Sequence, residues 1–261
     1  MAERKSPRRP AARTSWDPVA EWYQGMVGEG GHKYHRRYAI PAILDLLAPR
    51  AGEHILDIGC GPAPLAPFIA EAGARYVGVD ASPRLLAAAR QHHGRDGRFI
   101  LGDARALQEL PDLSAGDFDA VTFLLSIQDM DPLNDVLRSA AWALRPGGNI
   151  VMLMTHPCFR VPRQSGWGWD EGRKLRFRRV DRYLTPLPVP MHPPSGGVTR
   201  SFHRPLEAYI NGLAAHGMLT EQLAEIPAYD EREAKGQARA DNLSDREIPL
   251  FLGIRARKVT R

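Results

Sequence analysis

Two glycines and two carboxylates near the first apolar segment have the spacing of a nucleoside site. Residues 54–58 are apolar apart from His54 and Asp57, and Gly59 and Gly61 follow directly. Glycine lets the backbone approach a ligand closely, and the helix expected next presents free N–H groups to it. A second apolar segment ends about twenty positions later on Asp80, whose carboxylate can accept both hydroxyls of a ribose. We therefore expect a nucleoside to bind here.

The carboxylate ahead of the glycines distinguishes this loop from a dinucleotide-binding loop. The dinucleotide pattern is Gly-x-Gly-x-x-Gly, whereas this chain reads Asp57-x-Gly59-x-Gly61-x-Ala63. Asp57 would place negative charge beside the ligand, which favours a cationic amino-acid group and repels a pyrophosphate. The stretch resembles motif I of class I S-adenosylmethionine-dependent methyltransferases, with Ala63 in place of the family's third glycine.

Further segments follow in the order of the motifs of that family. Residues 98–104 read as a strand that ends near Asp103, and residues 118–126 as a continuous apolar strand. A Leu-Arg-Pro-Gly-Gly turn at 144–148 precedes a fifth strand at 149–154. Continuous apolar strands are typical of a parallel sheet covered on both faces. The resemblance implies an α/β fold, a doubly wound, mostly parallel seven-stranded sheet with N-terminal helices and an inserted cap after strand five.

Helical segments alternate with these strands and should hold the site from both sides. We expect N-terminal helices at 17–26, with Asp17 as the cap, and at 33–47, both over the cofactor pocket. Ser82-Pro83 and Asp131-Pro132 have the composition of two later helix starts. The remaining expected elements are a helix at 64–72, a helix at 204–216 and an antiparallel strand pair at 218–226 and 248–258.

The segment after strand five has no convincing period. Residues 155–203 are rich in Pro, Gly, Arg and aromatic residues, and a long loop inside a compact domain usually has a function. We expect residues 156–203 to be a cap over the substrate, inserted in a methyltransferase domain at 54–261. A disordered basic tail at 1–14 and the helices at 15–53 would precede that domain.

The resemblance also implies the cofactor and the residues that bind it. S-adenosyl-L-methionine is the expected methyl donor, with Asp80 on the ribose and Asp103 near the adenine amino group. The implied cofactor-binding residues are Tyr23, Asp57, Gly59, Cys60, Gly61, Asp80, Ala81, Asp103, Ala104 and Leu125.

A small-molecule acceptor is the expected substrate, methylated on an O or N atom, with secondary metabolism as one setting. Residues expected to contact it are Gln128, Asp129, His156 and His203. A base is needed only where the acceptor loses a proton, and His156 directly after strand five is our candidate. The alternative for His156 is a structural role at the strand end. Trp167, Trp169, Phe177, Tyr183 and Phe202 could form a wall for the acceptor or pack the cap against the sheet.

Two alternative functions stay open: methylation of RNA or another nucleic acid, and a non-methylating relative that binds the same cofactor. The first thirteen residues carry five Arg or Lys and one Glu, which accounts for +4 of the net charge of +5. A Pro/Arg-rich tail of this kind is typical of disorder. No Asn-Pro-Pro-Tyr motif follows strand four, and we do not expect a nucleic acid as partner.

Composition limits the remaining possibilities. No apolar run reaches the eighteen residues of a membrane span, and the N-terminus lacks the apolar region of a secretory signal. The two cysteines, Cys60 and Cys158, indicate no disulfide framework, and no Cys/His spacing indicates a metal site. We expect a cytoplasmic protein, as a monomer or a homodimer.

Overall fold

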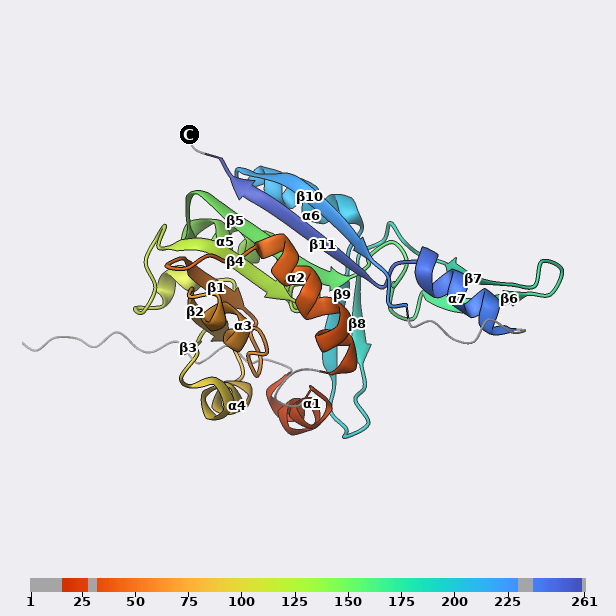
Figure 1. The fold of residues 1–261 in the computed structure, drawn as a ribbon, viewed down its shortest axis with the longest axis horizontal. Coiled ribbons are helices and arrows are strands. Elements are labelled where there is room, and N and C mark those ends of the chain that lie inside the picture. Colours follow the sequence, from red (N-terminus) through yellow and green to blue (C-terminus); the bar gives the residue numbers. More distant parts are fainter. Residues whose placement is uncertain (1–15, 28–31, 230–236, 260–261) are drawn as a thin grey trace, which may run out of the picture.

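The computed structural model describes residues 16–27, 32–229 and 237–259, and its centre is a seven-stranded sheet (Figure 1). The strand order is β10-β11-β5-β4-β1-β2-β3. The strands of this sheet are β1 (His54–Ile58), β2 (Arg75–Asp80), β3 (Gly97–Leu101), β4 (Phe118–Leu124), β5 (Leu144–Thr155), β10 (Met218–Ile226) and β11 (Phe251–Lys258). Strands β11 and β10 are antiparallel to their neighbours, and the other five run parallel. The predicted doubly wound, mostly parallel sheet is confirmed.

Helices cover both faces of the sheet because successive strand residues point to opposite sides. Ile55 of β1 packs in a core with α2, α3 and α4, whereas Leu56 packs in a second core with α5 and α6. The helices are α1 (Ala20–Val27), α2 (Ile40–Leu47), α3 (Ala66–Glu71), α4 (Pro83–His93), α5 (Leu133–Ala143), α6 (Leu206–Ala215) and α7 (Gln237–Glu247). Short helical turns are η1 (Asp17–Val19), η2 (His35–Ala39), η3 (Leu107–Glu109) and η4 (Ile127–Asp129).

Strand order determines where a ligand can enter. The chain places β2 and β3 on one side of β1, and β4 and β5 on the other. The loops that leave β1 and β4 therefore diverge, and ligands of open α/β sheets bind in the crevice that this reversal creates. The loop with Gly59 and Gly61 leaves β1 at this edge.

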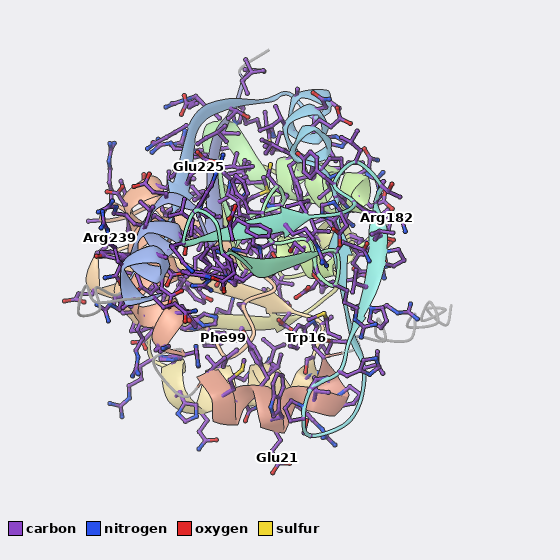
Figure 2. The ribbon with its side chains drawn as sticks, turned by 90° about the vertical axis from the view of Figure 1, so that its right-hand side faces the viewer. Trp16, Glu21, Phe99, Arg182, Glu225 and Arg239 are labelled. Carbon is purple, nitrogen blue, oxygen red and sulfur yellow. The ribbon has the colours of Figure 1, made fainter. Side chains whose placement is uncertain are left out.

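The two predicted N-terminal helices are present, with one change in geometry and one in capping. The second runs through a π-helical turn, η2, before α2 begins. Asp17 does not cap its own helix; its carboxylate accepts the Ser82 hydroxyl at 2.8 Å and the Arg84 N–H at 3.1 Å. Asp17 thus fixes the N-terminal segment to the start of α4. In Figure 2, Glu21 points from α1 into solvent, while Trp16 lies on the side of the sheet.

Both helices begin where the sequence predicted, α4 at Pro83 and α5 at Leu133, but only one of the two predicted caps is present. Ser82 caps α4, since its hydroxyl oxygen accepts the N–H of Leu85 at 3.2 Å. Asp131 does not cap α5, because Pro132 occupies the capping position and the Asp131 carboxylate instead accepts Arg204 Nη2 at 2.9 Å. A distant arginine therefore holds the side chain that the local sequence assigns to the helix.

The segment after strand five is not an irregular loop, as we expected, but forms two hairpins. These are β6 (Ser165–Asp170) with β7 (Leu175–Val180), and β8 (Leu187–Met191) with β9 (Thr199–His203). Glycine obscures the pattern in β6, where Phe177 of β7 packs directly over Gly168. The first hairpin lies beside α7, whereas the second reaches α1 (Figure 1). The predicted tail at 1–14 lies outside the described residues.

None of the described helices is long and apolar enough to cross a membrane. The described residues also contain no group of three or more His, Cys, Asp or Glu side chains that could hold a metal ion.

Candidate functional site

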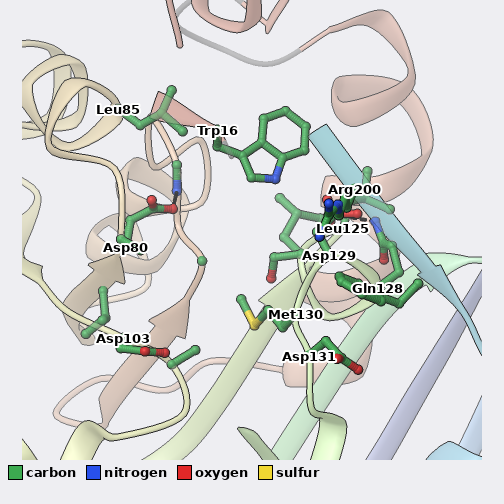
Figure 3. Close-up of a pocket in the computed structure, with 18 of the residues that line it drawn as sticks. Trp16, Asp80, Leu85, Asp103, Leu125, Gln128, Asp129, Met130, Asp131 and Arg200 are labelled. Carbon is green, nitrogen blue, oxygen red and sulfur yellow. Dashed lines mark hydrogen bonds between the residues drawn. The ribbon is translucent and has the colours of Figure 1, made fainter. Parts of the chain in front are cut away.

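A cavity of about 740 Å³ opens at the predicted edge of the sheet, between the loops after β1, β2, β3 and β4, the N-terminal helices and β9. This volume lies within the roughly 300–1,000 Å³ range of small-molecule sites. Figure 3 shows Asp80 and Asp103 on one side, Gln128, Asp129 and Arg200 on the other, and Trp16 between them. We call these sides the β2–β3 half and the β4–β9 half.

The glycine loop forms the floor of the β2–β3 half. Gly59 has a φ of +70°, and a Cβ there would lie 2.5 Å from Met130 Cε and 2.7 Å from Ser126 Cβ, so that only glycine fits. Gly61 has a φ of +55°, and a Cβ there would meet only the Tyr23 ring, at 3.7 Å. At Gly61, then, the backbone is open to the cavity. An open backbone of this kind is what the close approach of a ligand requires.

Asp80 ends β2 at the wall of the cavity. Its two carboxylate oxygens accept the N–H of Gly61 and of Ser82, each at 2.8 Å. Burial raises the pKa of Asp80, although these N–H groups oppose that shift. Each carboxylate oxygen keeps a further lone pair, so the group can still accept two hydroxyl donors. The hydrogen bonds fix the carboxylate relative to the glycine loop.

Asp103 lines the same half of the cavity, beside Ala104 and Arg105. Its carboxylate accepts two guanidinium nitrogens of Arg105, with an Nη2–Oδ2 distance of 2.6 Å. A bidentate pair of this kind fixes the orientation of a carboxylate. Among the other predicted cofactor residues, Tyr23, Ala81 and Leu125 also line the cavity.

Asp57 and Cys60 are exceptions, because they are buried and do not line the cavity. Asp57 is 1 % exposed and accepts the Tyr76 hydroxyl at 2.7 Å and the Thr122 hydroxyl at 3.1 Å. Burial raises the pKa of Asp57 to about 6. Tyr76 lies in β2 and Thr122 in β4, so Asp57 connects the three adjacent strands β4, β1 and β2 beneath the site. This position contradicts our expectation of a charge beside the ligand.

The β4–β9 half combines polar residues after β4 with side chains of β9. Gln128 and Asp129 belong to η4, and the Gln128 amide donates to the carbonyl of Leu125 at 2.6 Å. Arg200 and Phe202 line the opposite wall. Burial raises the pKa of Asp129 to about 8. The predicted substrate residues Gln128 and Asp129 thus lie together at the cavity.

The other two predicted substrate residues, His156 and His203, lie outside the residues that line the cavity. His156 Nδ1 accepts the N–H of Cys158 at 3.2 Å, and its Nε2 lies 3.0 Å from a Glu225 carboxylate oxygen. Thr155 lines the cavity while His156, the next residue, points to the other face of the sheet. The structure therefore does not support His156 as the base.

His203 likewise directly follows a residue that lines the cavity, Phe202, and points away from the cavity itself. Its Nε2 lies 2.6 Å from the carbonyl oxygen of Tyr183, whereas Phe202 and Arg200 point into the cavity. Of the aromatic residues expected to form a wall for the acceptor, Phe202 alone lines the cavity. Trp167 lies under the guanidinium of Arg176, 3.8 Å from its ring centroid, in the β6–β7 hairpin.

Sequence reasoning missed several residues of the cavity wall. Trp16 packs edge-to-face with Tyr23 at a centroid distance of 5.1 Å. His35 lines the cavity from the π-helical turn, and burial lowers its pKa to about 4, so its imidazole is neutral at physiological pH. Arg200 comes from the segment that had no recognisable period. Of these residues, only Trp16 could have been found from the sequence, because it is an aromatic residue directly before a predicted helix start.

Comparison with known proteins agrees with this geometry. Residues 56–152 match the model of a family described as Methyltransferase domain. A ubiquinone biosynthesis O-methyltransferase from Idiomarina loihiensis is 36% identical over 99 residues, which cover 38% of this chain and 41% of that protein. The corresponding protein from Aromatoleum aromaticum is 33% identical over 141 residues, 54% of this chain and 60% of that protein. The matches thus span less than two thirds of these curated relatives.

A solved structure covers more of the chain. The S-adenosylmethionine-dependent methyltransferase from Mesorhizobium loti has a TM-score of 0.69 and 28% identity, and the match covers 83% of this chain and 96% of that one. The fold, the cavity and these matches define a class I methyltransferase domain. The chain is thus similar in sequence and in fold to class I S-adenosylmethionine-dependent methyltransferases.

Proposed function

We propose that this protein transfers a methyl group from S-adenosylmethionine to an oxygen or nitrogen atom of a small-molecule acceptor. The observation that carries the proposal is the β2–β3 half of the cavity, where an open glycine backbone and the Asp80 carboxylate face the same space. S-adenosylmethionine is the methyl donor of the methyltransferases that this chain resembles, and the residues that line this half of the cavity fit it. The two curated relatives named above are O-methyltransferases, which favours oxygen as the methylated atom.

The donor would be held by groups that this chain orients in advance. Asp80 would accept the ribose hydroxyls, and the backbone at Gly61 would lie against the amino-acid portion. Asp103 would accept the adenine amino group. When bound, the donor supplies a methyl group already activated by a sulfonium sulfur, so the enzyme needs chiefly to align the acceptor and exclude water.

The acceptor would occupy the β4–β9 half, between η4 and β9. Phe202 offers an apolar face, whereas Gln128, Asp129 and Arg200 are polar. The β8–β9 hairpin reaches η1, where Gly197 packs against Val19. This hairpin and the N-terminal helices would cover both ligands and limit the acceptor to a small molecule. A cytoplasmic monomer or homodimer remains our prediction from the sequence.

The test is calorimetry with S-adenosylmethionine on the wild type and on Asp80→Ala. Loss of a charge-assisted pair of hydrogen bonds should weaken binding about ten- to a hundredfold, or roughly 1.5–3 kcal/mol. Asp80→Asn keeps an acceptor oxygen for the loop N–H groups, and it separates loss of charge from loss of loop structure. Unchanged affinity in both variants would reject the assignment of Asp80. Wild-type protein that does not bind the donor would reject the proposed function.

Transfer itself is tested by incubating the protein with the donor and a panel of phenols, carboxylates and amines. A mass gain of one methyl group in one acceptor class, dependent on the protein, is the expected result.

A further inference from the structure

Four carboxyl groups line the cavity, and they differ in what offsets their charge. Asp80 accepts two backbone N–H groups, Asp103 pairs with Arg105, and Asp131 pairs with Arg204. Asp129, the fourth, forms no ion pair with any residue that the structure describes. Its partner is a neutral hydroxyl, that of Ser201 in β9.

The side chains around Asp129 explain why it has no ion pair. Tyr23 of α1 and Tyr209 of α6 face it, and both are neutral phenols with pKa values raised by burial. Arg204 is close enough to favour its charged form, but that guanidinium donates to the Met130 carbonyl at 2.6 Å and to Asp131 at 2.9 Å. Arg204 also lies over the Phe202 ring, 5.3 Å from its centroid. Arg204 thus forms its ion pair with Asp131 and not with Asp129.

Burial without an ion pair favours the protonated form of a carboxyl group. Asp129 is partly exposed at the cavity wall, and its pKa is raised to about 8, so this group is mostly protonated at pH 7. A protonated carboxyl cannot act as a base. A positive charge that enters the same cavity would stabilise the carboxylate and release that proton.

We propose that Asp129 is the base that removes the proton from an acceptor hydroxyl, and that the charge of the methyl donor prepares it for this role. This inference rests on the proposed function. Binding of the sulfonium releases the Asp129 proton to solvent. As the acceptor oxygen bonds to the methyl carbon, the methyl–sulfur bond breaks and sulfur keeps the electron pair. The hydroxyl proton passes to the Asp129 carboxylate, and the spent donor is a neutral thioether.

This sequence returns Asp129 to its protonated form after each turnover. The proton lost when the donor binds is regained from the acceptor. The carboxylate becomes the main form when the cationic donor is present, so the base is available when methyl transfer is possible. Gln128, Arg200 and Phe202 would hold the acceptor beside it.

Proton release on donor binding tests the inference without an acceptor. Calorimetry at pH 7 in phosphate and in Tris, whose ionisation enthalpies differ, gives the number of protons released per ligand. S-adenosylmethionine should release up to about one proton, because a group with a pKa of about 8 is mostly protonated at pH 7. S-adenosylhomocysteine differs only by the methyl group and its charge, and should release clearly fewer.

Asp129→Asn should abolish the difference between the two ligands and keep the affinity for S-adenosylhomocysteine within a few-fold. The matched control is Asp112→Asn, which removes an exposed carboxylate paired with Arg98 outside the cavity and should leave proton release unchanged. Equal release for both ligands in the wild type, or a difference that persists in Asp129→Asn, would overturn the inference. Neither result would affect the proposed function, which fails only if the donor does not bind or no acceptor is methylated.

Turnover provides a second measurement. With the hydroxyl acceptor found in the panel, Asp129→Asn should lower kcat about 10²- to 10⁴-fold. The wild-type fall in kcat toward low pH should disappear in this variant. A variant with near-wild-type kcat would show that alignment alone suffices and that Asp129 is not the base.

Discussion

Gly59→Ala tests why position 59 requires glycine: because neighbouring side chains leave no room for a Cβ, or because the backbone is left-handed there. A left-handed conformation costs a non-glycine residue about 1–2 kcal/mol. The new Cβ would also lie 2.7 Å from Ser126 Cβ and 2.5 Å from Met130 Cε. The Met130 methyl can rotate away, but Ser126 is held by its hydrogen bond to the Ile58 carbonyl at 2.7 Å. Overpacking of this kind costs roughly 1–3 kcal/mol.

The two terms together predict a loss of about 2–5 kcal/mol in the free energy of unfolding. Urea denaturation measures this loss, and the melting temperature should fall by roughly 4–20 °C for a chain of this size. Gly52→Ala is the matched control, because Gly52 has a φ of +85° but no atom within 4 Å of its would-be Cβ. That control should lose only the backbone term, about 1–2 kcal/mol.

A second substitution isolates the clash. Ser126→Gly removes the Cβ that the alanine methyl at position 59 would contact, so Gly59→Ala should cost less in that background than in the wild type. If Gly59→Ala and Gly52→Ala are equally destabilising, and Ser126→Gly gives no relief, the close packing around the loop is not what requires glycine there.

Two further predictions concern the scaffold and the acceptor wall. Asp57 ionises near pH 4 in the unfolded chain and near pH 6 in the folded one, so the folded state binds more protons between these values. Its contribution to stability is therefore full below about pH 4 and is lost as the pH rises to about 6. Urea denaturation across this range should show a smaller fall in the free energy of unfolding for Asp57→Asn than for the wild type. An unchanged slope of this free energy against pH would mean that Asp57 is ionised when buried. Phe202→Ala should raise KM for the acceptor about tenfold or more through loss of an aromatic contact, with unchanged donor affinity. Trp167→Ala, in the β6–β7 hairpin, should change neither KM nor donor affinity. Equal effects of the two substitutions would mean that Phe202 does not contact the acceptor.

The glycine loop and Asp80 of the β2–β3 half could be predicted because these residues are close in sequence. Gly59 and Gly61 directly follow a strand, and Asp80 ends the next strand, so one strand–helix–strand unit brings them together. Tyr23, Ala81, Asp103 and Leu125 follow from the same order of elements. Local periodicity and glycine placement encode that unit without help from the rest of the chain.

The β4–β9 half could be predicted only in part. Gln128 and Asp129 were identified because they follow β4, but Arg200 comes from a hairpin that the Pro- and Gly-rich sequence obscured. His156 and His203 are each one residue away from side chains that line the cavity. A strand alternates its side chains between two faces, and the sequence near a strand end does not show which phase meets the ligand.

The sequence by itself determined the order of strands, the glycine turn and the position of Asp80, since these depend on contiguous residues. The tertiary structure decided which carboxylates line the cavity. Asp57 lies under the site because Tyr76 and Thr122, 19 and 65 residues away, supply its hydrogen bonds. Asp129 lines the cavity without an ion pair, whereas Asp131 and the Met130 carbonyl engage Arg204. The charge of a carboxyl group depends on burial and on partners from distant segments, and only the folded chain brings those segments together.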